Sequence, residues 1–522
     1  MKNRKIVLFD TTLRDGTQSE GVSIGVEDKI NIAGALKKLG VHYIEGGWPG
    51  SNPKDAEFFS RMKKISLKPS LLTAFGSTRR KNIKAADDQN LIQLIKAKPD
   101  AFCIFGKTSL MHVKDALRTT PSENLKMIKD SVRYLKKTGK EVIYDAEHFF
   151  DGYKENRDYA LSTLDAAAEG GADWICLCDT NGGSMPEEIS DITKDAMTRL
   201  PDLKFGIHAH NDCDLAVANS LAAVSAGAEM VQGTINGWGE RCGNANLSSL
   251  MANLVLKRGA GVKNISVKDI KKLTKVSRYI DEVANLIPKK EQPFVGSSAF
   301  AHKGGVHVSA VLKNASTYEH LSPAAVGNER RVLISDLSGQ ANLKARSKQL
   351  DIKLEDKENL SEVLKEIKNR EAAGYQYEAA NASLKLLVKR IEGKVPLFFD
   401  VKSCRVILEY AGGRKKSEAS VKLAVKGKTV YEVAEGDGPV NALDNCLRKA
   451  LLPFFPKVGE ISLTDFKVRV LNPADATAAA VRVFIESADS SDRWTTTGVS
   501  EDVIEASWSA LVESIVYKLL KK

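Results

Sequence analysis

Eight short apolar runs, separated by stretches of helical periodicity, constrain the first ~240 residues of this 522-residue chain more than any other sequence feature. The runs are rich in β-branched residues and are bounded by polar residues or glycine, as strands are. We expect strands at Ile6–Leu13, Tyr43–Trp48, Leu71–Gly76, Ala101–Gly106, Glu141–Glu147, Asp173–Asp179, Lys204–His210 and Met230–Ile235.

The stretches between these runs favour helices. From Asp28 to Leu39, for example, the apolar residues fall on one helical stripe. Glycine follows the expected helix ends at Gly40, Gly139, Gly171 and Gly227. Eight strands alternating with helices predict an α/β fold of the (β/α)8 or TIM-barrel type. An open doubly wound sheet is the alternative, but it normally carries Gly-x-Gly-x-x-Gly after its first strand, and this chain has Thr-Thr-Leu-Arg-Asp-Gly there.

Reactive residue types gather at the carboxyl ends of the expected strands. The clusters are Asp10-Thr-Thr-Leu-Arg14-Asp15-Gly16, Glu147-His148, Asp179-Thr180, His208-Ala-His210-Asn-Asp212 and the loop Asn236–Asn244. The amino-terminal ends lack such residues. Because barrel enzymes carry their active sites at the carboxyl ends of the strands, this asymmetry predicts an active site there.

His208 and His210 are two residues apart on a strand, so both rings point to the same face. Facing inward, and joined by the carboxylate of Asp15, they offer a metal ion three ligands with positions left open. Asn244 offers a further oxygen. The alternatives are a hydrogen-bonded histidine pair, an Asp-Gly turn and a loop cap. On ligand type alone, magnesium, manganese, zinc and iron all remain open.

Three further residues are candidates for catalysis or substrate binding. The guanidinium of Arg14 can bind an alkoxide or a carboxylate, or form a surface salt bridge. Burial of Glu147 at the end of an apolar strand would raise its pKa for acid–base work, although it would equally serve to orient a histidine. Thr180 can donate a hydrogen bond to a substrate carboxylate or cap a helix.

Three of these motifs resemble the signatures of the aldolase-like, metal-dependent acyltransferases and lyases. They are Asp10-Thr-Thr-Leu-Arg-Asp-Gly-Thr-Gln18, His208-Ala-His-Asn-Asp212 and Gly239-Glu-Arg-Cys-Gly-Asn-Ala-Asn246. The family includes 2-isopropylmalate, homocitrate and citramalate synthases and hydroxymethylglutaryl-CoA lyase. The resemblance extends through Phe300-Ala-His-Lys-Gly-Gly-Val-His307 to the C-terminal region, which the lyase lacks. A synthase is therefore favoured.

The resemblance implies a role for each candidate. Asp15, His208 and His210 would bind a divalent metal, Mg²⁺ or Mn²⁺ in first place and Zn²⁺ as a further option, with Asn244 nearby. Arg14 would hold the ketone oxygen of a 2-oxoacid and Thr180 its carboxylate. Glu147 would act with His307, whose companion would be Tyr318. The sequence departs from the isopropylmalate synthase pattern after His307, where Val308-Ser-Ala replaces Gln-Asp-Gly.

Two longer motifs, Tyr43–Lys54 and Tyr144–Tyr153, resemble the long citramalate synthases most closely. That resemblance implies condensation of acetyl-CoA with pyruvate, the first step of a pyruvate route to isoleucine; 2-isopropylmalate or homocitrate synthesis is the alternative. Trp48, Phe75, Phe102 and Tyr144 lie near expected strand ends, where they would limit the acceptor pocket or simply fill the barrel. A different class, an amino-acid sensor on an inactive barrel, is disfavoured because the candidate residues are intact.

The second half of the chain predicts two further regions. We divide the sequence into a catalytic barrel (1–265), helical linker subdomains (266–372) and a C-terminal α+β domain (373–522). Within the linker, an amphipathic helix is expected at Ile270–Ile287 and a helical start at Val308–Leu312, just after His307. The family implies that the linker carries His307 into a neighbouring subunit's site, hence a homodimer.

The C-terminal domain contains an internal repeat of three strands and a helix. Ala442 aligns with Ala506 and Leu447 with Leu511, an offset of 64 residues in both pairs. The repeat alone is typical of a dimerisation module. The family resemblance favours an allosteric domain that binds a pathway end product, with isoleucine the expected effector.

Composition excludes several other classes. The net charge is +11, but lysines are spread along the chain without a basic, aromatic-rich stripe, so nucleic-acid binding is not predicted. No apolar run approaches the ~18 residues of a membrane span, and the N-terminus lacks the apolar core of a signal peptide. Seven cysteines without a Cys-x-x-Cys pair predict no disulfide framework and fit a reducing cytoplasm.

Overall fold

The structure, a computed structural model, describes residues 5–334, 342–343, 357–411, 414–471 and 478–521. The chain forms two compact units. One contains Met1–Phe300 and Leu321–Glu329, and the other contains Ala301–His320 and Arg330–Lys522.

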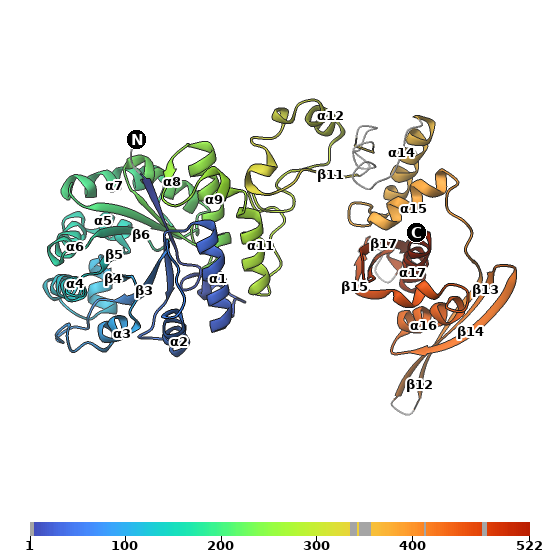
Figure 1. Cartoon of the computed structure of the whole chain (residues 1–522), viewed down its shortest axis with the longest axis horizontal. Helices are drawn as coiled ribbons and strands as arrows, with labels where there is room; N and C mark the ends of the chain where they lie inside the picture. The colour runs from blue at the N-terminus through green and yellow to red at the C-terminus, as the bar shows by residue number, and fades with distance from the viewer. Residues whose placement is uncertain (1–4, 335–341, 344–356, 412–413, 472–477, 522) are drawn as a thin grey trace. The chain divides into compact units, whose positions relative to one another are not determined.

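The first unit is a closed parallel barrel, which confirms the predicted fold class (Figure 1). Its strands are β1 (Lys5–Asp10), β2 (Tyr43–Gly47), β3 (Leu71–Ser77), β4 (Ala101–Lys107), β5 (Glu141–Glu147), β6 (Trp174–Asp179), β7 (Lys204–Ala209) and β8 (Met230–Gly233). Strand β1 closes the barrel because it pairs with β2 on one side and with β8 on the other. All eight predicted runs form strands. Strand β9 (Gly261–Val262) was not predicted; it pairs with the amino-terminal end of β1, at Lys5 and Ile6.

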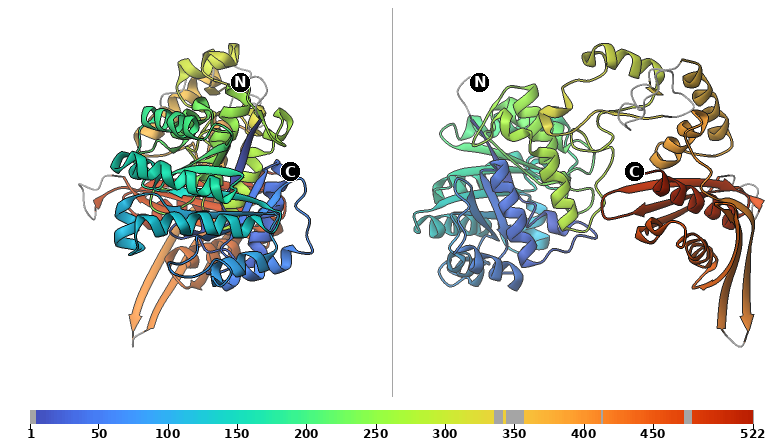
Figure 2. Two further views of the ribbon diagram at one scale, coloured as in Figure 1. Left: turned by 90° about the vertical axis from the view of Figure 1, so that its left-hand side faces the viewer. Right: turned by 45° about the vertical axis from the view of Figure 1, so that its right-hand side comes forward.

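Helices follow the strands and cover the outside of the barrel, as Figure 2 shows. They are α1 (Val26–Leu39), α2 (Pro53–Met62), α3 (Gln89–Ala97), α4 (Pro121–Lys136), α5 (Phe149–Glu155), α6 (Arg157–Gly170), α7 (Pro186–Arg199), α8 (Ala216–Ala226) and α9 (Leu247–Ala252). Gly40 and Gly171 end their helices in the left-handed conformation, which glycine adopts without steric cost.

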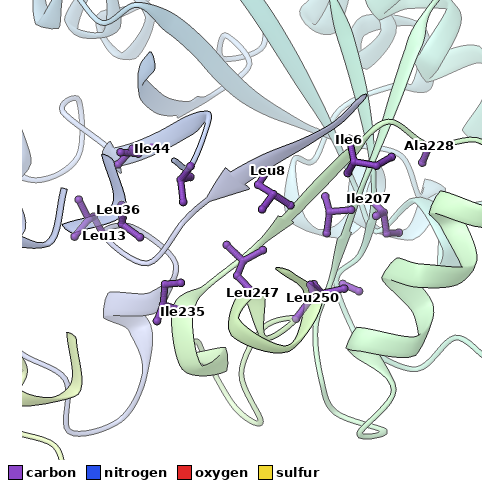
Figure 3. Packing of buried hydrophobic residues seen from close by; sticks show 14 of the residues in the cluster. Ile6, Leu8, Leu13, Leu36, Ile44, Ile207, Ala228, Ile235, Leu247 and Leu250 are labelled. Carbon is purple, nitrogen blue, oxygen red and sulfur yellow. The ribbon is translucent and has the colours of Figure 1, made fainter. Parts of the chain in front are cut away.

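Alternation along the strands divides the core of this unit into two layers. On β1, Val7 and Phe9 belong to the cluster inside the barrel, whereas Ile6 and Leu8 belong to the larger cluster between strands and helices. Figure 3 shows part of the outer layer, with Leu36 of α1 lying near Leu13. Side chains at alternate strand positions are therefore committed to opposite sides of the barrel wall.

The helix expected at Ile270–Ile287 is broken into shorter elements. They are α10 (Val267–Ile270) and α11 (Leu273–Val283). Two residues beyond α11, Asn285 adopts a positive φ of 57°, which the helix cannot continue through. The amphipathic segment is therefore helical as predicted, but it ends before Pro288.

The second unit begins with β10 (Ala301–His302), α12 (Gly305–Lys313), β11 (Arg331–Val332), α14 (Lys357–Ala372) and α15 (Asn381–Ile391). The helical start predicted at Val308 lies three residues further on than the observed one. His307 is thus part of the first turn of α12 instead of preceding the helix.

The C-terminal part has the predicted repeat of three antiparallel strands and a helix. The first half comprises β12 (Asp400–Ala411), β13 (Arg414–Val425), β14 (Lys428–Gly436) and α16 (Pro439–Leu451). The second comprises β15 (Ser462–Val470), β16 (Val481–Ala488), β17 (Arg493–Ser500) and α17 (Val503–Leu520). The aligned pairs Ala442 with Ala506 and Leu447 with Leu511 are all buried in the cluster that the halves share.

The predicted division into three regions, 1–265, 266–372 and 373–522, stays a prediction, since the compact units divide the middle region between them. Helix α15 lies inside the predicted C-terminal region but before the repeat. It packs against the second half, where the Ser383 hydroxyl accepts a hydrogen bond from the backbone N–H of Thr497. Within the described residues, no helix combines the length and apolarity that a membrane span requires.

The outer layer of the barrel yields a stability test. Leu36 of α1 is fully buried, so Leu36→Ala leaves a cavity and should lower the free energy of unfolding of the barrel by about 2–5 kcal/mol. Lys38→Ala, at an exposed position of the same helix, is the matched control. Hydrogen exchange of the barrel strands, followed by mass spectrometry in the full chain, measures the difference. Equal exchange in the two variants would contradict the packing described here.

Candidate functional site

A cavity of about 230 Å³ opens at the carboxyl ends of the barrel strands. Polar residues from β1, β5, β6 and β7 reach it, as the sequence predicted from the strand ends. Its lining residues are Arg14, Asp15, Gln18, Trp48, Phe75, Phe105, Asp145, Glu147, Cys178, Thr180, His208, His210, Glu240 and Arg241.

The structure brings Asp15, His208 and His210 together. The Nε2 atom of His208 lies 3.3 Å from an Asp15 carboxylate oxygen and 3.4 Å from Nε2 of His210. All three side chains are buried, and their ligand atoms lie within 4.8 Å of one another. Two imidazoles and a carboxylate are an arrangement that divalent metals accept.

The environment of these groups sets their charge. Burial opposes ionisation of Asp15, but Arg14 and the two histidines outweigh it and hold the pKa of the carboxyl well below its usual range. Burial, reinforced by the neighbouring His208, lowers the pKa of His210 to about 4. A neutral imidazole beside a carboxylate is the protonation state that a cation ligand needs.

The side-chain oxygen of Asn244 adds to the fit with a cation, because it is buried and has no hydrogen-bond partner. Nδ1 of His210 is likewise buried without a partner, but Nε2 is the nitrogen of this ring that faces Asp15 and His208. Asn244 lies beside His210 because their backbones form an isolated antiparallel bridge. Its amide nitrogen donates to the carbonyl of Trp238 over 3.2 Å, which leaves the oxygen available. The predicted ligand set thus suits a divalent ion.

Arg14 is held in place by Glu45, a residue whose role the sequence analysis did not identify. The guanidinium Nε donates to a Glu45 carboxylate oxygen over 2.7 Å, and the hydroxyl of Thr11 donates to the same oxygen. The guanidinium carbon lies 3.7 Å above the centre of the Phe75 ring. A carboxylate inside the apolar strand Tyr43–Gly47 was the available sequence signal.

Thr180 and Glu147 both reach the rim of the cavity. The hydroxyl oxygen of Thr180 accepts a hydrogen bond from the backbone N–H of His148 over 2.8 Å, so its proton remains available for donation. Glu147 is only partly buried and forms an ion pair with Lys107. The expectation that Glu147 is buried in apolar surroundings is therefore wrong. Lys107 lies opposite Glu147 in the register of β4 against β5 and supplies a cation there.

Tyr144 is the substrate-binding candidate that the structure does not bring to the cavity. It is fully buried in the layer between strands and helices, where its ring lies against Gly106, and Phe102 belongs to the same layer. Because strand residues alternate, Tyr144 and Asp145 point to opposite sides of the barrel wall. Trp48 and Phe75 do line the cavity, joined by Phe105, which stacks on Phe75 at a centroid distance of 5.4 Å.

His307 and Tyr318 belong to the second unit. Their rings lie together, with centroids 4.2 Å apart, and both side chains are exposed. The structure therefore brings these two predicted partners to each other, while their role at the barrel stays a prediction. The nearby His302 is engaged elsewhere, since its Nε2 lies 3.2 Å from a carboxylate oxygen of Glu319.

Arg241, in the loop after β8, is a further residue that the sequence analysis did not single out. Its guanidinium binds both carboxylate oxygens of Asp212 at 2.7 and 2.9 Å and donates to the carbonyl of Thr180 at 2.8 Å. It thereby ties the loop that carries Asn244 to the ends of β6 and β7. The sequence feature that could have identified Arg241 was its position in the motif Gly239–Asn246.

Comparison with known proteins places this geometry in a family. Residues 5–280 match the sequence model described as HMGL-like. The chain belongs to the HMGL-like family. Residues 294–374 match a homocitrate synthase post-HMGL domain, and residues 378–519 match the LeuA allosteric (dimerisation) domain.

Full-length relatives refine this assignment. The chain is 53% identical to an (R)-citramalate synthase of Aquifex aeolicus (strain VF5), covering 99% of this chain and 98% of the relative. It is also 53% identical to an (R)-citramalate synthase of Geobacter sulfurreducens, with the same coverage. A 2-isopropylmalate synthase of Methanocaldococcus jannaschii is 31% identical over 99% of this chain and 95% of the relative. The identity to these two citramalate synthases is thus markedly higher than the identity to this isopropylmalate synthase.

Proposed function

We propose that this chain is an acyltransferase that condenses acetyl-CoA with pyruvate, giving (R)-citramalate and free coenzyme A as the first step of a pyruvate route to isoleucine. The main support for the proposal is one cluster at the cavity. In it the side chains of Asp15, His208 and His210 lie together beside the guanidinium of Arg14. The choice of pyruvate is supported by the full-length relatives at 53% identity.

In this proposal Asp15, His208, His210 and Asn244 hold a divalent metal ion, Mg²⁺ or Mn²⁺ in first place and Zn²⁺ as the alternative. The donors are two imidazole nitrogens, a carboxylate and an amide oxygen, which all three ions accept. When bound, the ion supplies Lewis-acid polarisation of the acceptor's keto group.

The residues around the ligand set would orient the acceptor and stabilise developing charge. Arg14 is aimed by Glu45, so its remaining N–H groups can donate to the keto oxygen as that oxygen becomes an alkoxide. Thr180 would donate its hydroxyl proton to the carboxylate of pyruvate. The aromatic wall of Trp48, Phe75 and Phe105 would leave room for a methyl group and disfavour longer side chains.

The proposed reaction consumes one water molecule in addition to acetyl-CoA and pyruvate. A base removes one proton from the acetyl methyl group, and the resulting carbon nucleophile forms a bond to the keto carbon of pyruvate. The keto π bond breaks in this step, and its oxygen becomes an alkoxide that takes up a proton to give the hydroxyl group. Water then cleaves the thioester, giving a carboxylate and the thiol of coenzyme A. We assign the proton transfers to His307 with Glu147, and a supporting role to Tyr318. The ion pair with Lys107 would hold the Glu147 side chain in place at the rim.

The C-terminal domain would join two chains into a dimer and regulate their activity. Residues 378–519 match a domain described as allosteric and dimerising, and we propose a homodimer that isoleucine inhibits. We also propose that the enzyme acts in the cytoplasm, since its seven cysteines are all free, as is typical of a reducing compartment.

The acceptor is tested by release of coenzyme A from acetyl-CoA with pyruvate, 2-oxoisovalerate and 2-oxoglutarate compared side by side. Pyruvate should give the highest kcat/KM, because each additional carbon in a tight pocket is worth about 1–3 kcal/mol of discrimination. Added isoleucine should lower the rate with pyruvate. A kcat/KM for 2-oxoisovalerate equal to or above that for pyruvate would instead support 2-isopropylmalate synthesis.

The metal site is tested by titrating Mn²⁺ into the chelator-stripped full chain. Electron paramagnetic resonance should detect one bound ion per chain, and His210→Ala should abolish this binding because it removes one of the four proposed protein ligands and one of the two imidazoles. His42→Ala is the matched control, since His42 precedes β2 at the opposite end of the barrel. Undiminished binding in His210→Ala would place the ion elsewhere.

The contribution of Arg14 is tested by Arg14→Ala. The variant should lower kcat by ~10²–10³, the scale found for loss of one oxyanion donor. Arg199→Ala, at an exposed salt bridge with Asp165 on the outer helices, should leave the rate unchanged. A decrease below about threefold in Arg14→Ala would remove Arg14 from the mechanism.

A further inference from the structure

Two buried polar residues inside the barrel, Asp145 and Gln232, have not yet been given a role, although Asp145 lines the cavity. Asp145 of β5 is 4% exposed, and Gln232 of β8 is fully buried. Burial of a carboxylate in a barrel interior is unfavourable unless hydrogen bonds compensate for the lost hydration. The contacts of both residues lead to His208.

The three side chains form a chain of hydrogen bonds. The amide nitrogen of Gln232 donates to an Asp145 carboxylate oxygen over 2.8 Å, and the amide oxygen of Gln232 lies 2.9 Å from Nδ1 of His208. Beyond the ring, Nε2 of His208 faces Asp15 and His210. Gln232 thus connects the buried carboxylate of Asp145 to the proposed ligand His208.

The direction of each hydrogen bond is fixed by chemistry. Burial raises the pKa of Asp145 to about 6, so at neutral pH the carboxylate is ionised and only accepts. Gln232 must therefore present its NH₂ group to Asp145 and its oxygen to His208. Because an amide oxygen only accepts, His208 has to carry a proton on Nδ1, so Nε2 is the ring nitrogen that can bind an ion.

We propose that Gln232 is a positioning residue for metal binding: anchored by Asp145, it fixes the tautomer and ring orientation of His208 so that Nε2 faces the ion. The inference rests on the proposed function, because it assumes that His208 is a ligand. Partners behind ligating histidines commonly change metal affinity by about 10–100-fold when they are removed.

A competing interpretation of Asp145 is less well supported. Asp145, Cys176 and Cys178 form a second buried group of possible ligands. Burial raises the pKa of both thiols above the usual range, so both are protonated at neutral pH. Asp145 is moreover already engaged by Gln232.

The test measures the Kd for Mn²⁺ by electron paramagnetic resonance on the chelator-stripped full chain. Gln232→Met keeps the approximate volume but removes both hydrogen bonds, and it should raise the Kd by about 10–100-fold. Asn219→Leu, which removes a buried amide of α8 that donates to the carbonyl of Ser184 over 2.8 Å, should leave the Kd within about twofold of wild type. Circular dichroism confirms that each variant is folded.

A double variant separates positioning from packing. In Asp145→Asn/Gln232→Glu, the new amide can donate and the new carboxylate can accept, so an acceptor again faces Nδ1 of His208. The Kd of the double variant for Mn²⁺ should return to within about threefold of wild type. If Gln232→Met does not fold, the double variant alone tests the role of Gln232. A folded double variant that binds Mn²⁺ more than tenfold more weakly would overturn the proposal.

The outcomes distinguish this inference from the proposed function. Wild-type protein that binds no Mn²⁺ would remove the metal site itself, and with it the premise. Wild-type protein that binds Mn²⁺ and forms citramalate, together with a folded Gln232→Met variant whose Kd is within twofold, would leave the proposed function intact and overturn only the role of Gln232.

Discussion

The strict alternation of side chains along the strands of a closed barrel is the constraint on which the rest of the structure depends. Every strand residue faces either the interior or the helices, and closure through β1 leaves no strand free to shift its register. His208 and His210 share the interior because they are two residues apart. Since all eight strands are parallel, their carboxyl ends meet at one rim, where loops of different strands add Asp15 and Asn244.

The site is stabilised because its buried charges are paired across strands. Arg14 lies between the carboxylates of Glu45 and Asp15, with one face on the ring of Phe75. Removing either carboxylate would leave the buried guanidinium with only one of its two partners, which costs more than the loss of a surface ion pair. The cluster is thus pre-organised, and little rearrangement is needed when a cation and an anionic acceptor enter.

The sequence predicted those parts of the site that follow from local pattern. His208 and His210 were accessible from strand periodicity, and Asp15 and Thr180 from their position after a strand. Tyr144 was misplaced because the run Glu141–Glu147 is buried on both faces, and no hydrophobic alternation shows which residues face inward. The pairing of Glu147 with Lys107 depends on the register of β4 against β5, which no local pattern encodes.

The C-terminal repeat raises a separate physical question, namely what covers its strands. Within the described residues, β12 and β15 are edge strands that pair on one side only. Apolar side chains are exposed on both, including Leu408 and Tyr410 on one and Phe466 and Val468 on the other. Long, exposed apolar edges invite association, and natural proteins normally cover them. Two equivalent edges in a pseudo-symmetric domain suit a second copy of the same chain, because a twofold axis would cover both at once. The exposed apolar side chains on these strands therefore support the homodimer that we propose from the family match.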